Sequence, residues 1–461
     1  MSSEKLSQNF QGGAPGTTLG REPQKAALSK QAAGEPITLG PYPDKVGREE
    51  LLEVLELWQF SPATRQQLIK LIQADPNFKG PNLFRYYNER SVVVRTEKAF
   101  SQLIGTSYCL ATNSCTSALV SAYRALGIGA GAEVIVPAFT FSATATAAAA
   151  ANAVPVIVEC DDTLNLDVAA AEAAITPRTK AIAAVHICGS PAQMDAIMDL
   201  ARRKGLPVVE DVAQAGGGSF KGKRLGSLGT MGCFSFDYFK IMVSGEGGFL
   251  TTNDEWLFTR ATSWHDSSGC WRPDRFIPET KPGELFSGEN YRMSELQGAV
   301  ALAQIRKCDT TLGGFRRAKA RIKAGIEKFP GVSFRRHSDE AGDAASCLIM
   351  YLPSLEAKRQ AVRQLQAQGV PATLLHDPEV PDWHTYCDWD YILERKAVAA
   401  DGLPWSALPA AQQPRYSRMM CPRTMALLAR AFSISINCNF SDADCDAIAA
   451  RINQVFHQIL K

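Results

Sequence analysis

The sequence lacks a charge excess, a long apolar run and closely spaced cysteines. Its 49 basic and 47 acidic residues leave a net charge of +2 over 461 residues. This balance does not favour nucleic acid or an anionic membrane surface as a partner. The first ten residues have no apolar core of the signal-peptide kind, and no later segment suggests a membrane span. We therefore expect a cytoplasmic protein that binds neither nucleic acid nor membrane.

The twelve cysteines are scattered, and no two of them form a Cys-x-x-Cys pair. This usage is typical of reduced thiols that fill small core sites, so we expect no disulfide framework and no metal site. Hydrophobic residues make up 46% of the chain, which is enough to bury a sizeable core. The length allows two or more domains.

Short β-rich runs alternate with helical patterns between Tyr108 and Asn253. The runs are residues 108–111, 133–137, 155–159, 181–186, 207–210, 233–236 and 249–252. The helical patterns are residues 116–126, 142–151, 167–175 and 192–204. This order predicts an α/β fold in which helices cover a mostly parallel seven-stranded sheet. Ligands of such sheets bind beyond the carboxyl ends of the strands.

The composition predicts three parts. Residues 1–40 are rich in small and polar residues and are expected to form a flexible arm. Residues 41–305 would form a large domain that includes the sheet, and its first helices are expected at 48–58 and after Ser61. Residues 306–461 would form a smaller α+β domain, which ends in a helix capped near Ser441.

One lysine lies in an aromatic run and precedes a cluster of glycines, Ser235-Phe-Asp-Tyr-Phe-Lys240-Ile-Met-Val-Ser-Gly-Glu-Gly-Gly248. Burial among aromatic side chains disfavours the ammonium form and would leave a nucleophilic amine. An ordinary alternative is a lysine that extends its charge from a sheet edge into water. The loops after the other strands decide between the two.

Three of these loops carry groups that suit a phosphorylated, protonated ring. Residues 113–117, Asn-Ser-Cys-Thr-Ser, open a helix whose first amides could hold a phosphate. Phe141 could stack on a planar ring, and Asp211 ends a strand where a carboxylate needs a cationic partner. Each group also has an ordinary alternative, namely a helix cap, a core aromatic residue or a second cap. Together with Lys240 they meet the requirements of pyridoxal 5'-phosphate.

The order of these motifs resembles the DegT/DnrJ/EryC1/StrS family, whose members are fold-type-I pyridoxal-phosphate enzymes and mostly sugar aminotransferases. The motifs include Val136-Pro-Ala-Phe-Thr-Phe141, Val209-Glu-Asp-Val-Ala-Gln-Ala215, Phe234-Ser-Phe-Asp-Tyr-Phe-Lys240 and Asn290-Tyr-Arg-Met-Ser-Glu-Leu-Gln297. The match is good over residues 51–307 and loose beyond them. Within the family, the lysine run and residues 382–391 are most similar to enzymes that form 8-amino-3,8-dideoxy-octulosonate.

The resemblance implies a role for each matched position. Lys240 would form an aldimine with the cofactor and then carry the proton during catalysis. Asp211 would pair with the ring nitrogen, Gln214 would lie near the phenolic oxygen, and Phe141 would stack on the ring. The phosphate would be held by Cys115, Thr116, Ser117 and Ser235. Asn290 would reach the phosphate of the neighbouring subunit, which implies a homodimer with shared active sites.

Two interpretations are open for some of the other positions. Gln214 could instead order the glycine turn behind it, and His186 could either touch the substrate or be a hydrogen-bonded structural histidine. His384 lies in an aromatic-rich stretch and reads as a core or interface residue. The loop from Trp264 to Gly288 follows no pattern that we can place, and the N-terminal arm has no evident function.

The resemblance implies an aminotransferase that moves an amino group from an amino acid, glutamate or glutamine, to a keto sugar or related keto acceptor. A second reading keeps the cofactor but changes the reaction to decarboxylation, elimination or oxidation of an amino acid. The unplaced loop keeps this second reading open. A third reading is a non-catalytic sensor, and the intact lysine, acid and phosphate loop argue against it.

Overall fold

The computed structural model describes residues 45–81, 83, 90–268 and 279–460. The chain separates into a small unit that ends at Phe84 and a large unit that begins at Arg85. The expected arm, residues 1–40, lies outside the described residues. The expected boundary at 305/306 falls within a long helix, α10 (Glu295–Gly325). The three-part division therefore stays a prediction.

The small unit contains α2 (Arg48–Leu55) and α3 (Pro62–Ala74), which confirms the two helices expected there. Ser61 caps α3, since its hydroxyl accepts a hydrogen bond from the Thr64 amide at 3.3 Å. Arg48 links the helices by donating to the carbonyl of Ile72 at 2.9 Å.

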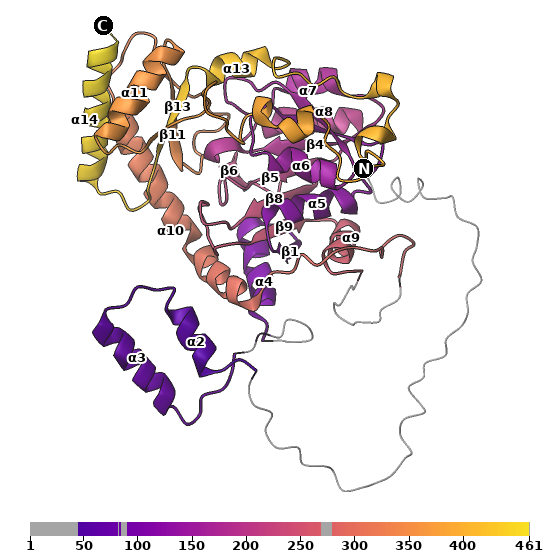
Figure 1. Ribbon diagram of the computed structural model, residues 1–461, viewed down its shortest axis with the longest axis vertical. Coiled ribbons are helices and arrows are strands. Elements are labelled where there is room, and N and C mark those ends of the chain that lie inside the picture. Colours follow the sequence, from indigo (N-terminus) through magenta and orange to yellow (C-terminus); the bar gives the residue numbers. More distant parts are fainter. Residues whose placement is uncertain (1–44, 82, 84–89, 269–278, 461) are drawn as a thin grey trace. The chain divides into compact units, whose positions relative to one another are not determined.

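Seven strands form the central sheet of the large unit, in the order β1-β9-β8-β5-β4-β2-β3 (Figure 1). They are β1 (Tyr108–Thr112), β2 (Glu133–Pro137), β3 (Val154–Val158), β4 (Thr179–Val185), β5 (Val208–Asp211), β8 (Met231–Ser235) and β9 (Gly248–Thr252). Strand β9 is antiparallel to both of its neighbours, and the other strands run parallel to one another. The predicted fold class and its seven strands are confirmed.

Helices cover both faces of this sheet because successive strand residues point to opposite sides. Val134 and Val136 belong to the apolar cluster on one face, and Ile135 belongs to the cluster on the other. The first face packs against α5 (Cys115–Ala125), α6 (Ala143–Ala150) and α9 (Glu255–His265). The second packs against α4 (Val92–Ile104), α7 (Val168–Ala174), α8 (Met194–Lys204) and α10.

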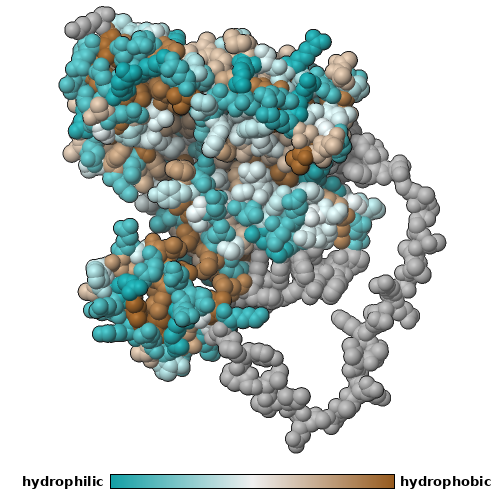
Figure 2. Space-filling view, viewed as in Figure 1, coloured by the Kyte–Doolittle hydropathy of each residue, from teal (hydrophilic) through white to brown (hydrophobic). Residues whose placement is uncertain are grey.

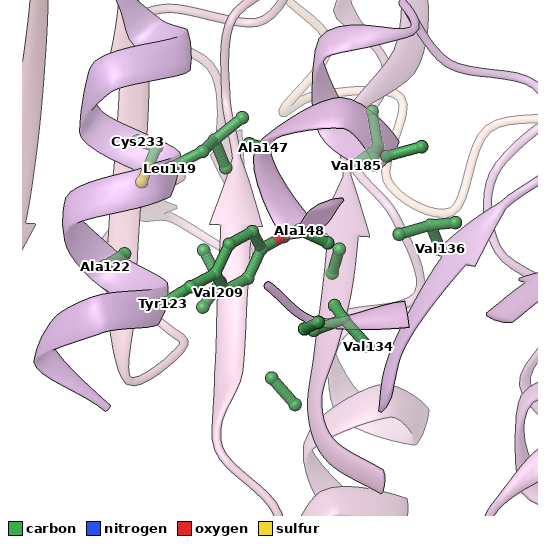
Figure 3. Close-up of a cluster of buried hydrophobic side chains, with 14 of the residues drawn as sticks. Leu119, Ala122, Tyr123, Val134, Val136, Ala147, Ala148, Val185, Val209 and Cys233 are labelled. Atoms are coloured by element: carbon green, nitrogen blue, oxygen red, sulfur yellow. The ribbon is translucent and has the colours of Figure 1, made fainter. Parts of the chain in front are cut away.

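Figure 3 shows the first of these clusters. Tyr123 of α5 lies among the valines of the strands, and Ala147 and Ala148 of α6 lie on the same side of the sheet. Small alanine side chains allow α6 to approach the strands closely. Each fully buried valine stabilises the fold by about 1.5–3 kcal/mol. This packing fixes the start of α5 beside the ends of the strands.

A second, antiparallel sheet has the strand order β10-β11-β13-β12. Its strands are β10 (Ser333–Phe334), β11 (Cys347–Tyr351), β12 (Ala372–Leu374) and β13 (Ala431–Ser435). It packs against α10, α11 (Leu355–Ala367) and α14 (Asp442–Ile459). Figure 1 shows α10 running from α4 to α14. Figure 2 shows mainly hydrophilic side chains over α11 and α14, whose apolar sides belong to the core.

The predicted cap of the last helix is confirmed. The Ser441 hydroxyl accepts a hydrogen bond from the Asp444 amide at 3.2 Å, and the Asp444 carboxylate accepts one from the Ser441 amide at 2.9 Å.

The remaining elements are short. They are β6 (Ser219–Phe220), β7 (Lys223–Arg224), η3 (Ile187–Gly189), η4 (Tyr386–Asp388), α12 (Asp390–Leu393), η5 (Trp405–Ala407), η6 (Ala410–Gln412) and α13 (Pro422–Leu428). None of the helices in the described ranges combines the length and apolar character needed to cross a membrane. Every cysteine that the structure describes is a free thiol.

Candidate active site

A cavity of about 710 Å³ lies at the carboxyl ends of β4, β5 and β8. Open α/β sheets bind their ligands at this edge. The cavity is lined by seven of the ten site residues predicted from the sequence, Cys115, Thr116, Phe141, Asp211, Gln214, Ser235 and Lys240. Residues of the second sheet, Ser433 and Ser435, lie on its wall, so the cavity is formed by both sheets of the large unit.

The N-terminus of α5 forms one wall. The amides of Cys115 and Thr116 belong to the first helical turn and have no helical acceptor, so they can bind an anion. Ser117 does not line the cavity; its hydroxyl donates to Asn113 at 2.6 Å, and its amide donates to Ser114 at 3.1 Å. Behind this turn, a Cβ at Gly248 would lie only 2.7 Å from the Cys115 amide nitrogen. Glycine at this position therefore allows the turn to pack against β9.

Lys240 lies in a tight loop after β8. Its amide donates to the Asp237 carbonyl at 3.0 Å, and the Asp237 amide donates to the Ser235 hydroxyl at 3.3 Å. Within the described ranges, the amino group of Lys240 has no hydrogen-bond or ion-pair partner. The sequence predicts that the aromatic run shields this amine from water. That prediction is wrong for two of its aromatic residues, because Tyr238 and Phe239 are 74% and 86% exposed. The amine is nevertheless free to react in the cavity.

The two acidic residues at the end of β5 differ in their surroundings. Asp211 lines the cavity and accepts hydrogen bonds from the Thr144 hydroxyl at 2.7 Å and the Ala213 amide at 3.1 Å. Burial raises the pKa of Asp211, although these hydrogen bonds and the nearby charge of Lys240 oppose the shift. A buried carboxylate of this kind favours a cationic partner in the cavity.

Glu210 points away from the cavity and is fully buried. Its carboxylate accepts hydrogen bonds of 2.5–2.8 Å from the amides of Gly226, Leu228 and Gly229, and it lies 3.1 Å from Nε2 of His186. Glu210 therefore holds the turn that leads into β8, and it makes no contact with the site.

Glu210→Gln is expected to lower the free energy of unfolding by about 3 kcal/mol, because the amide cannot replace the charged acceptor of three backbone N–H groups. Thermal unfolding of the variant measures this loss. The control is Glu172→Gln, which removes a carboxylate paired with Arg203 at the surface and should cost far less, because solvent screens such a pair. Equal losses in the two variants would contradict the role given to Glu210.

His186 does not line the cavity and is fully buried. Its second ring nitrogen, Nδ1, accepts a hydrogen bond from the Ala192 amide at 3.0 Å, so both nitrogens are used within the protein. This placement favours the structural reading of His186 over contact with a substrate. Gln214 lines the cavity, and its side-chain oxygen accepts a hydrogen bond from the Cys188 amide at 2.8 Å.

Asn290 is exposed and lies apart from the cavity of its own chain. It pairs with Asp266 in an isolated β-bridge, and its side-chain oxygen accepts from the Arg292 amide at 3.3 Å. Its contact with the phosphate of a partner subunit stays a prediction. Of the unplaced loop, residues 269–278 lie outside the described residues.

Trp383 and His384 are among the cavity residues that the sequence analysis did not predict. Their segment pairs with the loop after β2: the amides of Thr140 and Ser142 donate to the carbonyls of His384 and Trp383, both at 2.9 Å. The His384 ring lies 5.4 Å from the Phe141 ring, centroid to centroid. The aromatic richness of this segment was the only signal, and it did not distinguish a cavity wall from a core.

Cys188 and Cys347 also line the cavity, although the sequence placed the cysteines in the core. The Cys347 thiol donates a hydrogen bond to the Cys188 carbonyl at 3.5 Å, so the two residues are neighbours at the cavity wall. No spacing rule could pair two residues so distant in the chain.

Comparison with known proteins assigns the chain to a family. The model of the DegT/DnrJ/EryC1/StrS aminotransferase family matches residues 86–401, which is more than half of the chain. The chain belongs to this family. The resemblance seen in the sequence is confirmed at that level, and the likeness to octulosonate-forming enzymes stays a prediction.

Two curated relatives show how similar this aminotransferase is to known proteins. GDP-perosamine synthase of Caulobacter vibrioides is 35% identical over 318 residues, which cover 68% of this chain and 83% of that protein. L-glutamine:2-deoxy-scyllo-inosose aminotransferase of Streptomyces paromomycinus is 41% identical over 220 residues, which cover 47% and 52%. The second match therefore spans only about half of each protein.

Solved structures of similar fold include 3-amino-5-hydroxybenzoic acid synthase, with a TM-score of 0.69 and 26% identity over 87% of this chain and 97% of that one. An aminotransferase from Psychrobacter cryohalolentis has a TM-score of 0.66 and 25% identity, over 87% and 98%. Each similarity in fold thus extends over more than four fifths of this aminotransferase.

Proposed function

We propose that this aminotransferase binds pyridoxal 5'-phosphate in the cavity and transfers an amino group from glutamate or glutamine to a keto sugar or a related keto acceptor. One observation carries the proposal: the cavity brings together the unpartnered amine of Lys240, the buried carboxylate of Asp211 and the first amides of α5. These groups lie in three separate loops, and they match the aldehyde, the ring nitrogen and the phosphate of the cofactor.

The residues present fit this cofactor. Burial raises the pKa of Asp211, so a protonated ring nitrogen in the cavity would supply the missing positive charge. Cys115 and Thr116 are the first residues of α5 and line the cavity together with Ser235. The helix dipole stabilises a negatively charged phosphate at this end of the helix. The Phe141 ring lies at the cavity wall, where it can cover one face of a planar ring.

When bound, pyridoxal phosphate supplies an aldehyde that reacts with amines and a ring that accepts an electron pair. The amine of Lys240 would hold the cofactor, and the same amine could take a proton from the substrate carbon. Asp211 would stabilise a positive charge on the ring nitrogen, and the α5 amides would hold the phosphate. Each step assigned to the chain thus uses a residue of the cavity.

The rest of the lining suits a hydroxyl-rich acceptor. Ser346, Ser433, Ser435, Glu246 and His384 also line the cavity and offer donors and acceptors. Trp383 adds an exposed apolar face, which favours the ring of a sugar. The names of the two curated relatives described above refer to a nucleotide sugar and to a cyclitol ketone. These properties support a polyhydroxylated keto compound as the acceptor.

The donor is tested by adding a panel of amino acids to the purified, cofactor-loaded protein. Glutamate or glutamine is expected to shift the visible absorbance of the cofactor to that of its amine form, with release of one equivalent of the matching keto acid. If both leave the spectrum unchanged while another amino acid releases carbon dioxide or ammonia, the decarboxylation or elimination reading replaces transamination.

We infer that two copies of the chain form a homodimer around the cavities. Tyr238 and Phe239 are large, exposed side chains in the loop that carries Lys240, and Phe239 lines the cavity. Such residues are typical of interfaces. Sedimentation at micromolar protein is expected to give twice the chain mass of 50.0 kDa. A monomer with full activity would contradict shared active sites.

A further inference from the structure

A second group of reactive side chains lies outside the cavity, in the second half of the chain. His376 follows β12, whereas Cys387 and Asp388 belong to η4. One ligand atom from each, a ring nitrogen, the thiol sulfur and a carboxylate oxygen, lies within 4.8 Å of the other two. His376 and Cys387 are buried, and Asp388 is half-buried.

His376 has no partner that explains its burial. His376 is 6% exposed, and its buried Nδ1 has no hydrogen-bond partner among the described residues. Buried polar atoms are normally hydrogen-bonded, and an unpartnered imidazole beside a thiol and a carboxylate indicates a missing ligand.

The charged side chains next to the cluster are bonded to groups other than its three ligand atoms. The Asp377 carboxylate accepts from Arg359 at 2.7 Å, and the Asp382 carboxylate lies 2.9 Å from Nδ1 of His384. The nearest cation, Lys358, is turned to the backbone, since its amino group donates to the carbonyls of His376 and Leu428. Arg418 likewise donates to the Cys387 carbonyl. The ligand atoms are therefore not occupied by these positive side chains.

We propose that His376, Cys387 and Asp388 bind a zinc ion. Imidazole nitrogen, thiolate sulfur and carboxylate oxygen are the three ligand types that zinc takes in proteins, and three ligands leave the fourth tetrahedral position to water. On binding, the Cys387 thiol gives up its proton to solvent as the sulfur–zinc bond forms, and no electron is transferred.

The position of the site indicates what the zinc would stabilise. The Asp388 carboxylate accepts a hydrogen bond from the Asp382 amide at 2.9 Å. Asp382 in turn lies 2.9 Å from Nδ1 of His384, and His384 and Trp383 form part of the cavity wall. Zinc would thus anchor the segment 382–388 to His376 and so fix the cavity wall that this segment supplies.

The test uses the full chain with its cofactor. The protein is stripped with a chelator and dialysed against zinc chloride, and its zinc content is then measured by mass spectrometry. The wild type is expected to retain one zinc per chain, and Cys387→Ser and His376→Gln are expected to retain none. The control Cys445→Ser changes a buried thiol of α14 and should retain the zinc. Equal zinc content in all variants, or none in the wild type, would overturn the proposal.

A second measurement does not depend on how the variants fold. Cobalt(II) added to the stripped wild type is expected to give the visible d–d bands of a tetrahedral site with a thiolate ligand, at longer wavelengths than the cofactor absorbs. Added zinc should abolish these bands. If only the pale spectrum of hydrated cobalt is seen, the site does not exist.

Discussion

Replacing Lys240 by alanine is expected to lower the rate of transamination by about 10⁴-fold or more, because the variant loses both the amine that binds the cofactor and the group that moves the proton. The visible absorbance band of the bound cofactor should be lost at the same time. Steady-state kinetics with the best donor from the panel, together with the absorbance spectrum, measures both effects.

The matched control is Lys223→Ala, which removes an exposed lysine of β7. It should leave the rate and the spectrum unchanged, since this side chain does not line the cavity. Lys240→Arg tests whether the positive charge alone is sufficient, because arginine keeps the charge but cannot react with the aldehyde. Near-normal turnover by Lys240→Ala would contradict the assignment.

Asp211→Asn is expected to lower the rate by about 10²- to 10³-fold, because the neutral amide cannot stabilise a positive ring nitrogen as charge develops during the reaction. The substitution keeps the shape of the side chain and leaves an oxygen that can accept from Thr144, so the fold should be preserved. Rapid-mixing kinetics of the donor half-reaction measures the loss, and cofactor absorbance shows whether the site is still filled.

Glu210→Gln is the informative comparison for Asp211, since it changes the adjacent carboxylate on the same strand. Glu210 binds backbone amides behind the sheet edge, so its loss should reduce stability more than the half-reaction rate. Asp211→Asn is therefore expected to lower the rate more than the stability, and Glu210→Gln to lower the stability more than the rate. If Glu210→Gln slows the half-reaction as much as Asp211→Asn does, the acid under the ring has been misassigned.

Most of the large-unit fold could be predicted because its signals are local. The strands β2 and β3 are short apolar runs, and α5 and α6 have the composition of buried helices, so their order alone predicts the layered α/β sheet. The second sheet could not be placed in this way. Its strands β10 and β12 have only two or three residues, and their pairing depends on contacts between distant parts of the chain.

The site was predictable where its residues follow strands of the first sheet. Asp211 and Phe141 were located because the carboxyl ends of parallel strands meet at one edge, whereas Ser235 was assigned from the family resemblance. Trp383 and His384 were not, because they reach the cavity only through the backbone pairing of their segment with residues 138–142. The exposure of Tyr238 and Phe239 could not be predicted either, since an aromatic run does not reveal which side chains face solvent.

The most direct test of the account is to find the residue to which the cofactor is joined. The cofactor-loaded protein is reduced with borohydride, which fixes the cofactor covalently, and the digested chain is analysed by mass spectrometry. We predict that the added mass lies on the peptide that contains Lys240, and that Lys240→Ala carries none. Added mass on another lysine, or none on the wild type, would contradict the central claim.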